Sequence, residues 1–257
     1  MALPKIDHPI YTIYLKSLNR DVKFRPFLVK EEKILLMAKE SKDVVEIQTA
    51  VKQIIGNCCL EQIDIDALPL FDIEMAFLKL RARSVGESVK FIFNCQNETG
   101  QSENGDPIIC NTDTDYAVDL AKIEFVTPEG HDPKVMITDK LGIKLKYPTI
   151  SMDLTRLKDS TEKNEEDNKK ESAYDILLQM IIDNIEYIFD MESIYKPEDT
   201  PAEELDEFLL NLNSENMEKI QEFFNTAPTV TLIDHVKCKK CGFEHTLKTE
   251  GLLSFFI

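Results

Sequence analysis

The sequence predicts an α+β fold, in which antiparallel strands and helices occupy separate stretches of the chain. Three observations predict it. Segments rich in β-branched and aromatic residues open the chain and recur in its middle. Apolar residues at helical spacing fill the stretches that follow them. The charged and polar run 158–172 has no aliphatic or aromatic residue, so it cannot fold alone and is expected to be a linker.

The chain opens with a predicted β-hairpin. PIYTIYL (9–15) and VKFRPFL (22–28) have strand composition, and the polar turn KSLNRD separates them. Pro26 cannot donate a backbone hydrogen bond, which favours an edge position for the second strand. A helix over 30–39 is expected to follow.

Two more helices are expected in the first part of the chain. Asp43 is an N-cap residue type with Glu46 three residues later, a variant of the capping box. Apolar residues at helical spacing continue from there to Cys58. Asp72 is expected to cap the next helix, and Gly86 is expected to end that region.

The middle of the chain is predicted to be β-rich. SVKFIFNC (88–95) has strand alternation, and extended structure resumes with IIC at 108. KVMITD (134–139) and GIKLKYP (142–148) are expected to be two strands around a short turn. NTDTD (111–115) lacks the glycine and the bidentate glutamate of a calcium loop, so we interpret it as a polar turn.

The second part is predicted to be helical before a closing strand. Apolar positions at helical spacing begin at Ala173 and continue through Ile185 and Ile188. Thr200 is an N-cap type followed by proline and a capping-box glutamate, which predicts another helix. PTVTLIDHVKC (228–238) is expected to be a strand.

These patterns divide the chain into five segments. The expected segments are a hairpin and helical region (1–87), a β-rich region (88–157), the linker (158–172), a helical region (173–228) and a C-terminal strand with a Cys-x₂-Cys knuckle (229–257).

The charge excludes some classes of partner. The net charge is −17, from 47 acidic and 30 basic residues, which argues against a general affinity for nucleic acid or an anionic membrane. No apolar run approaches the roughly 20 residues that span a bilayer. The N-terminus lacks the apolar core of a signal peptide. We therefore expect a reducing, cytosolic compartment, in which thiols stay free unless they bind metal or do redox work.

Four of the six cysteines have the character of metal ligands. Cys58 and Cys59 end an apolar helical pattern and are expected to pack in the core. The other four stand at the ends of predicted strands, and a glycine follows the last of them, so they are expected to form a closed, structural Zn²⁺ site of the zinc-ribbon kind. The predicted ligands are Cys95, Cys110, Cys238 and Cys241.

Three alternatives to this site stay open. The four cysteines could be buried independently, or Cys238 and Cys241 could form a redox-active dithiol, although no βαβ pattern surrounds them. His245 also has usable spacing and could replace Cys95 or Cys110 as a ligand. His131 and His235 are expected on the surface or in strands.

The chain carries no recognisable catalytic pattern. It lacks the phosphate-binding loops G-x-x-x-x-G-K-[ST] and G-x-G-x-x-G, the zinc-protease motif H-E-x-x-H and the nucleophile elbow G-x-S-x-G. The chain is therefore predicted not to be an enzyme. An adaptor subunit with a zinc ribbon, acting in some protein complex, is an alternative function.

Several stretches resemble a known family. They are VKFRPFLVKEEKILLMAKES (22–41), FDIEMAFLKLRARSVGE (71–87), IKLKYPTISM (143–152) and GLLSFF (251–256). They are similar to the baseplate hub and hub-assembly proteins of contractile-tailed phages of the T-even type. Two C-x₂-C knuckles are expected in such proteins; here the first pair is stretched to Cys95 and Cys110.

This resemblance implies a viral protein that acts by protein–protein contact and not by catalysis. Its partners would be other baseplate hub or tail proteins, including the tape-measure protein. Its location would be the host cytoplasm during assembly and the tail baseplate of the virion. Two segments are candidate contact surfaces, the run from Phe24 to Phe27 and the C-terminal LLSFFI (252–257), unless they pack within the chain itself.

Overall fold

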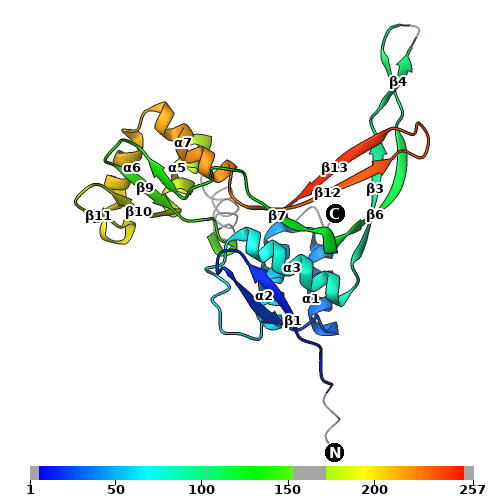
Figure 1. Cartoon of the computed structure of the whole chain (residues 1–257), viewed down its shortest axis with the longest axis horizontal. Helices are drawn as coiled ribbons and strands as arrows, with labels where there is room; N and C mark the ends of the chain where they lie inside the picture. Colours follow the sequence, from blue (N-terminus) through cyan, green and yellow to red (C-terminus); the bar gives the residue numbers. More distant parts are fainter. Residues whose placement is uncertain (1–5, 103, 153–171, 252–257) are drawn as a thin grey trace, which may run out of the picture.

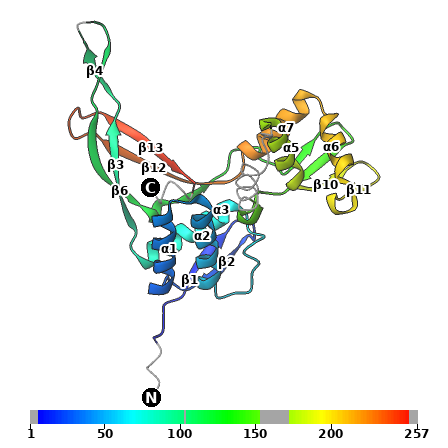
Figure 2. The ribbon, with the colours of Figure 1, turned by 180° about the vertical axis from the view of Figure 1, so that it is seen from behind.

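The computed structural model describes residues 6–102, 104–152 and 172–251. Most of the predicted linker 158–172 and the whole of 252–257 lie outside these residues. The described chain forms three parts (Figure 1), which we call the body, the arm and the lobe. Figure 2 shows the same three parts from behind. The α+β class is confirmed, and the division into five segments stays a prediction.

The body consists of a hairpin packed on three helices. β1 (Tyr11–Leu15) and β2 (Arg20–Phe24) pair antiparallel, which confirms the predicted hairpin. α1 (Val29–Ser41), α2 (Val44–Cys58) and α3 (Leu70–Ser84) follow. Asp43 caps α2 through its side chain, which accepts from the backbone of Val45 and Glu46. The largest fully buried side chains here include Phe24, Leu15, Ile54, Ile55, Ile73, Phe77, Leu78 and Leu80.

The prediction that Asp72 caps α3 is wrong. α3 begins after Pro69, and Asp72 lies inside its first turn. Its buried carboxylate accepts from the backbone N–H groups of Lys16 (2.7 Å) and Ser17 (2.9 Å) in the β1–β2 turn. Those amides face the body and need an acceptor, because a buried unpaired N–H is costly. Asp72 therefore fastens the hairpin to α3.

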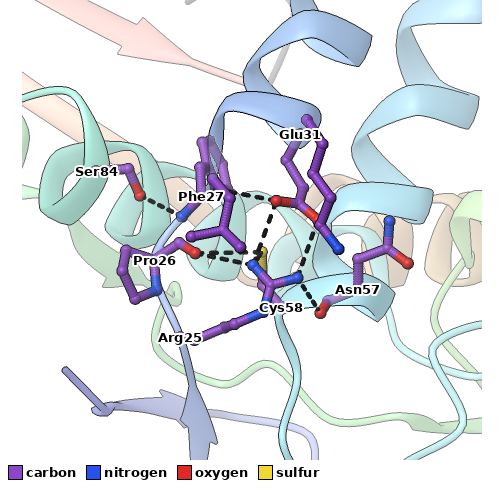
Figure 3. A network of polar contacts seen from close by, with 9 residues as sticks. Arg25, Pro26, Phe27, Glu31, Asn57, Cys58 and Ser84 are labelled. Carbon is purple, nitrogen blue, oxygen red and sulfur yellow. Dashed lines mark hydrogen bonds and ion pairs between the residues drawn. The ribbon is translucent and has the colours of Figure 1, made fainter. Parts of the chain in front are cut away.

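The run from Phe24 to Phe27 packs inside the chain. Phe24 is fully buried and Phe27 is 8% exposed. Figure 3 shows the guanidinium of Arg25 turned toward Glu31. It donates to both carboxylate oxygens of Glu31 (2.9 and 3.3 Å) and to the backbone oxygens of Pro26 and Asn57. The run thus joins β2 to α1 and α2, and these two phenylalanines are not available to a partner.

The arm is made of two antiparallel ribbons. One pairs β3 (Ser88–Cys95) with β6 (Thr112–Asp119), and the small hairpin of β4 (Glu98–Gln101) and β5 (Pro107–Ile109) extends its tip. In the other ribbon, β12 (Thr229–Lys237) pairs with β13 (Glu244–Glu250). β7 (Glu124–Val126), which follows the 3₁₀ turn Leu120–Lys122, pairs with the opposite edge of β12. Both views place the ribbons side by side (Figures 1 and 2).

Two details of the arm differ from expectation. NTDTD (111–115) is not a polar turn, because all but its first residue belong to β6, where pairing with β3 satisfies the backbone. β13 was not predicted at all. Its sequence EHTLKTE is mostly polar, and pairing with β12 makes it a strand.

The lobe is a four-stranded antiparallel sheet with helices on one face. Its strand order is β11-β10-β9-β8. The strands are β8 (Lys134–Met136), β9 (Gly142–Leu145), β10 (Ile185–Phe189) and β11 (Ile194–Tyr195). The α-helices are α5 (Ala173–Asp183), α6 (Ala202–Leu210) and α7 (Ser214–Asn225), with a 3₁₀ turn at Pro197–Asp199.

The predicted helix through Ile188 is too long. α5 ends at Asp183, and Ile185 and Ile188 lie in β10 opposite Leu145 and Ile143 of β9. β-Branched residues suit both patterns, so only the partner strand decides between them. α6 is preceded by Pro201 and not capped by Thr200, whose hydroxyl donates to the backbone oxygen of Lys196.

Aromatic rings join the body to the lobe. Tyr147 lies edge-on to Phe71 of α3 (5.1 Å between ring centroids) and stacks on Phe223 of α7 (5.3 Å). His131 stacks on both Tyr147 and Phe223 (5.6 and 5.2 Å). His131 is therefore part of an internal junction, which corrects the expected surface or strand position; His235 does lie in a strand, β12.

Hydrogen bonds keep His131 neutral. The Thr226 hydroxyl donates to the backbone oxygen of Glu222 (2.6 Å), so it accepts from Nδ1–H of His131 (2.9 Å). Nε2 then accepts from the Tyr147 hydroxyl (2.9 Å). Burial lowers the pKa of His131, and Lys16 lowers it further, while Asp132 opposes the change.

We predict that His131 makes stability depend on pH. Its pKa is lower in the folded chain than in the unfolded one, so its stabilising effect is complete above about pH 6.5 and is lost as the pH falls through the folded value. The melting temperature of the wild type should therefore drop more between about pH 7.5 and pH 5.5 than that of His131→Phe, which keeps a stacking ring but cannot titrate. Parallel curves for the two proteins would contradict this role.

We also predict that the Arg25–Glu31 pair is needed for stability. Glu31→Gln leaves an inward-facing guanidinium without its carboxylate, which should reduce the free energy of unfolding by about 3–5 kcal/mol in chemical denaturation. The control is Glu87→Gln, which breaks the exposed ion pair of Arg83 and Glu87 (3.1 Å) and should change stability by less than about 1 kcal/mol. Equal losses in both variants would contradict the prediction.

Candidate metal centre

The first two cysteines of the predicted site come from the β3–β6 ribbon. Cys95 is the last residue of β3, and Cys110 directly follows β5. The backbone N–H of Asn111 donates to the backbone oxygen of Cys95 (2.9 Å), and that of Cys110 to the oxygen of Asn97 (2.8 Å). Asn111 adopts a left-handed conformation (φ 45°), which turns the chain into β6. Both side chains are buried.

The other two come from the turn between β12 and β13. Cys238 follows β12, and Cys241 lies in the turn. The N–H of Gly242 donates to the oxygen of Cys238 (3.1 Å), and the N–H of Cys238 donates to the oxygen of Phe243 (2.8 Å). Gly242 has a φ of 73°, which favours glycine and closes the turn tightly. This is the predicted knuckle.

The four sulfur atoms meet between the two ribbons. Cys95 Sγ lies 3.6 Å from Cys241 Sγ, and Cys110 Sγ lies 3.7 Å from Cys238 Sγ. All four lie within 4.8 Å of one another. A tetrahedron with Zn–S bonds of about 2.3 Å has edges of about 3.8 Å, so the set has the size of one four-coordinate ion. All six cysteines of the chain are free thiols, and these distances are far longer than a disulfide.

Polar groups surround the sulfurs. The backbone N–H of Lys240 donates to Cys238 Sγ (3.4 Å), and the side-chain amide of Asn97 donates to Cys241 Sγ (3.8 Å). The Thr112 hydroxyl lies 3.4 Å from Cys110 Sγ, and Nε2 of His245 lies 3.1 Å from Cys95 Sγ. The N–H donors among these groups stabilise a metal-bound thiolate. The Thr112 hydroxyl is not such a donor, because it donates to the backbone oxygen of Cys110 (3.1 Å).

The thiols of this set differ in acidity. Burial, together with the neighbouring cysteines, raises the pKa of Cys95 to about 12. Backbone N–H groups of Cys241 and Lys240 lower the pKa of Cys238 to about 6. Cys238 therefore loses its proton easily, whereas Cys95 tends to keep its proton. A bound cation would supply the positive charge that all four need to be thiolates together.

The remaining predicted residues lie elsewhere or beside the cluster. Cys58 is fully buried in the body core, where burial raises its pKa to about 11, and Cys59 is half-buried beside it. His245 contacts Cys95 from outside the four-sulfur group. The four sulfur atoms lie within 4.8 Å of one another, and His245 is not part of this group. The sequence analysis did not predict that Asn97 and Thr112 lie beside the sulfur atoms. The alternation of side chains along the strand EHTLKTE could have predicted that His245 lies on the inner face of β13.

No helix in the described parts of the chain is long and apolar enough to cross a membrane. Comparison with curated proteins and with solved structures gives no match. A family model described as T4 bacteriophage base plate protein matches residues 8–257. That range contains the body, the arm with its four cysteines, and the lobe. The chain therefore belongs to the T4 bacteriophage base plate protein family.

Proposed function

We propose that this chain is a non-enzymatic component or assembly factor of the central hub of the phage baseplate. The observation that carries the proposal is the family match over residues 8–257. A baseplate protein works by binding other tail proteins. The chain would meet them in the host cytoplasm during assembly and, as a component of the hub, would remain in the tail; as an assembly factor it would leave before the tail is complete. The tape-measure protein is one such partner, because it would meet a hub at the centre of the tail.

The second element of the proposal is a structural zinc ion on Cys95, Cys110, Cys238 and Cys241. Thiolates are soft ligands that suit Zn²⁺, and the geometry of the four sulfurs fits a tetrahedral ion. Four protein ligands leave no position for water, so the ion would hold structure and take no part in catalysis. It would join strands from the middle of the chain to its last strands.

The open face of the lobe sheet supports contact with partners. The helices pack on the face of Ile143, Leu145 and Ile188. On the opposite face the ring of Phe189 lies across Gly142, where a Cβ would collide with it. Ile194 and Met136 extend this surface and are 63% and 44% exposed. Exposed apolar faces of this kind mark binding surfaces, and we propose that a neighbouring tail protein covers this one.

We predict about one zinc ion per chain in the purified protein. Cys241→Ser should lose most of the metal and lower the melting temperature, because the two ribbons then lose their common ion. Elemental analysis and thermal unfolding with and without a chelator measure both effects. The control is Cys59→Ser, whose thiol lies outside the four-sulfur group. Metal-free wild type, or unfolding that a chelator does not change, would contradict the zinc proposal.

We predict that Ile194→Asp weakens binding to tail proteins without unfolding the chain. Tagged protein from infected cells should recover hub and tape-measure proteins, and the variant should recover several-fold less of them. Leu210→Asp is the matched control, because Leu210 is similarly exposed (60%) but lies on α6. Recovery of outer baseplate proteins alone would contradict a place in the hub, and equal recovery by both variants would contradict binding through the open sheet face.

A further inference from the structure

His245 stands apart from the four cysteines but is held against one of them. It lies in β13 opposite Val236 of β12, on the side of the ribbon that faces β3 and β6. Its Nε2 atom is 3.1 Å from Cys95 Sγ. Cys95 is fully buried, so water cannot solvate its sulfur.

Two aromatic rings fix the imidazole in that position. Phe93 of β3 and Phe243 of the knuckle each lie 4.7 Å from it between ring centroids, at 55° and 64°. The three rings come from both ribbons of the arm. A side chain packed between two rings has few rotamers, so its Nε2 atom stays directed at the sulfur.

The contact has the geometry of a hydrogen bond. Nε2 lies 3.1 Å from Cys95 Sγ, within hydrogen-bonding distance of a sulfur atom. The four cysteines already supply four sulfur atoms within 4.8 Å of one another, enough for a four-coordinate ion without His245. An imidazole with its proton on Nε2 can donate to Cys95, as the backbone N–H of Lys240 does to Cys238 and the amide of Asn97 does to Cys241.

We propose that His245 is a positioning residue of the metal centre, which donates an Nε2–H hydrogen bond to the Cys95 thiolate and thereby retains the ion. The proposal rests on the proposed zinc site. Four thiolates around one divalent cation leave an excess of two negative charges, and each N–H directed at a sulfur offsets part of it. Without His245 the Cys95 thiolate loses its strongest side-chain donor, and its bond to the ion opens more readily.

Three variants separate the hydrogen bond from the packing. His245→Gln keeps an N–H donor on a side chain of similar reach but removes the ring. His245→Phe keeps a ring between Phe93 and Phe243 but removes the donor. His245→Ala removes both. The matched control is His235→Ala, because His235 also lies in this ribbon, on the exposed face, where Nδ1 contacts the Thr246 hydroxyl (3.3 Å).

The test is the transfer of zinc from the intact chain to a chromophoric chelator. His245→Ala and His245→Phe should hold zinc about 10–100-fold more weakly than wild type. His245→Gln should recover much of the difference, and His235→Ala should behave as wild type. Cobalt-substituted protein should show the absorption of four-thiolate coordination in every variant, because the ligands are unchanged.

The outcomes that overturn the proposal are distinct. Equal zinc retention in wild type and His245→Ala would show that the contact does not hold the ion. Retention by His245→Phe and loss by His245→Gln would assign the effect to aromatic packing. A changed cobalt spectrum in His245→Ala would make His245 a ligand. A wild type that binds no metal would instead overturn the proposed zinc site, and this inference with it.

Discussion

The arm depends on one constraint, which is that four sulfur atoms distant in sequence occupy a space the size of one ion. Cys95 and Cys241 are 146 residues apart, and Cys110 and Cys238 are 128 apart. Four thiols this close, three of them buried, cannot all ionise without a cation, because like charges repel strongly where water is excluded. Metal binding and closure of the arm would therefore be one event.

Apolar packing links the arm to the body. Val89 and Val118 at the base of one ribbon and Val230 and Leu232 of the other belong to the body core. Apolar packing therefore holds the ribbons together at the base, and the sulfur cluster lies at the far ends of β3 and β12. Between these two points each ribbon has an inner face against its neighbour and an outer face in solvent.

The lobe is attached by a different kind of contact. Tyr147 belongs to the apolar surroundings of both the body core and the lobe core. Its stacking on Phe223 and its edge contact with Phe71 span the two parts. Small aromatic contacts of this kind are individually weak, of about 0.5–1.5 kcal/mol, so the junction also depends on the hydrogen bonds of His131. These rings and hydrogen bonds therefore form one contact between body and lobe.

Local sequence patterns predicted those elements whose stability depends on residues close together in the chain. The hairpin, the first two helices and the cap at Asp43 follow from residue composition and spacing. The two helices were predicted close to their bounds, whereas the second strand of the hairpin was predicted at 22–28 and is found at Arg20–Phe24. The cysteine pattern likewise pointed to the four residues whose sulfurs meet. The prediction failed where contact with a distant segment of the chain determines the secondary structure. Ile185 and Ile188 suit a helix as well as a strand, and β9 makes them a strand.

The sequence by itself determined the fold class, the cysteines able to bind a soft metal ion, and the resemblance to phage baseplate proteins, because these depend on residue type and spacing. Only the tertiary structure decided that Asp72 holds a turn and that Phe24 and Phe27 are internal. It alone placed His245 against Cys95. The physical reason is that burial and hydrogen-bond partners are set by segments far away in the chain, which no local pattern encodes.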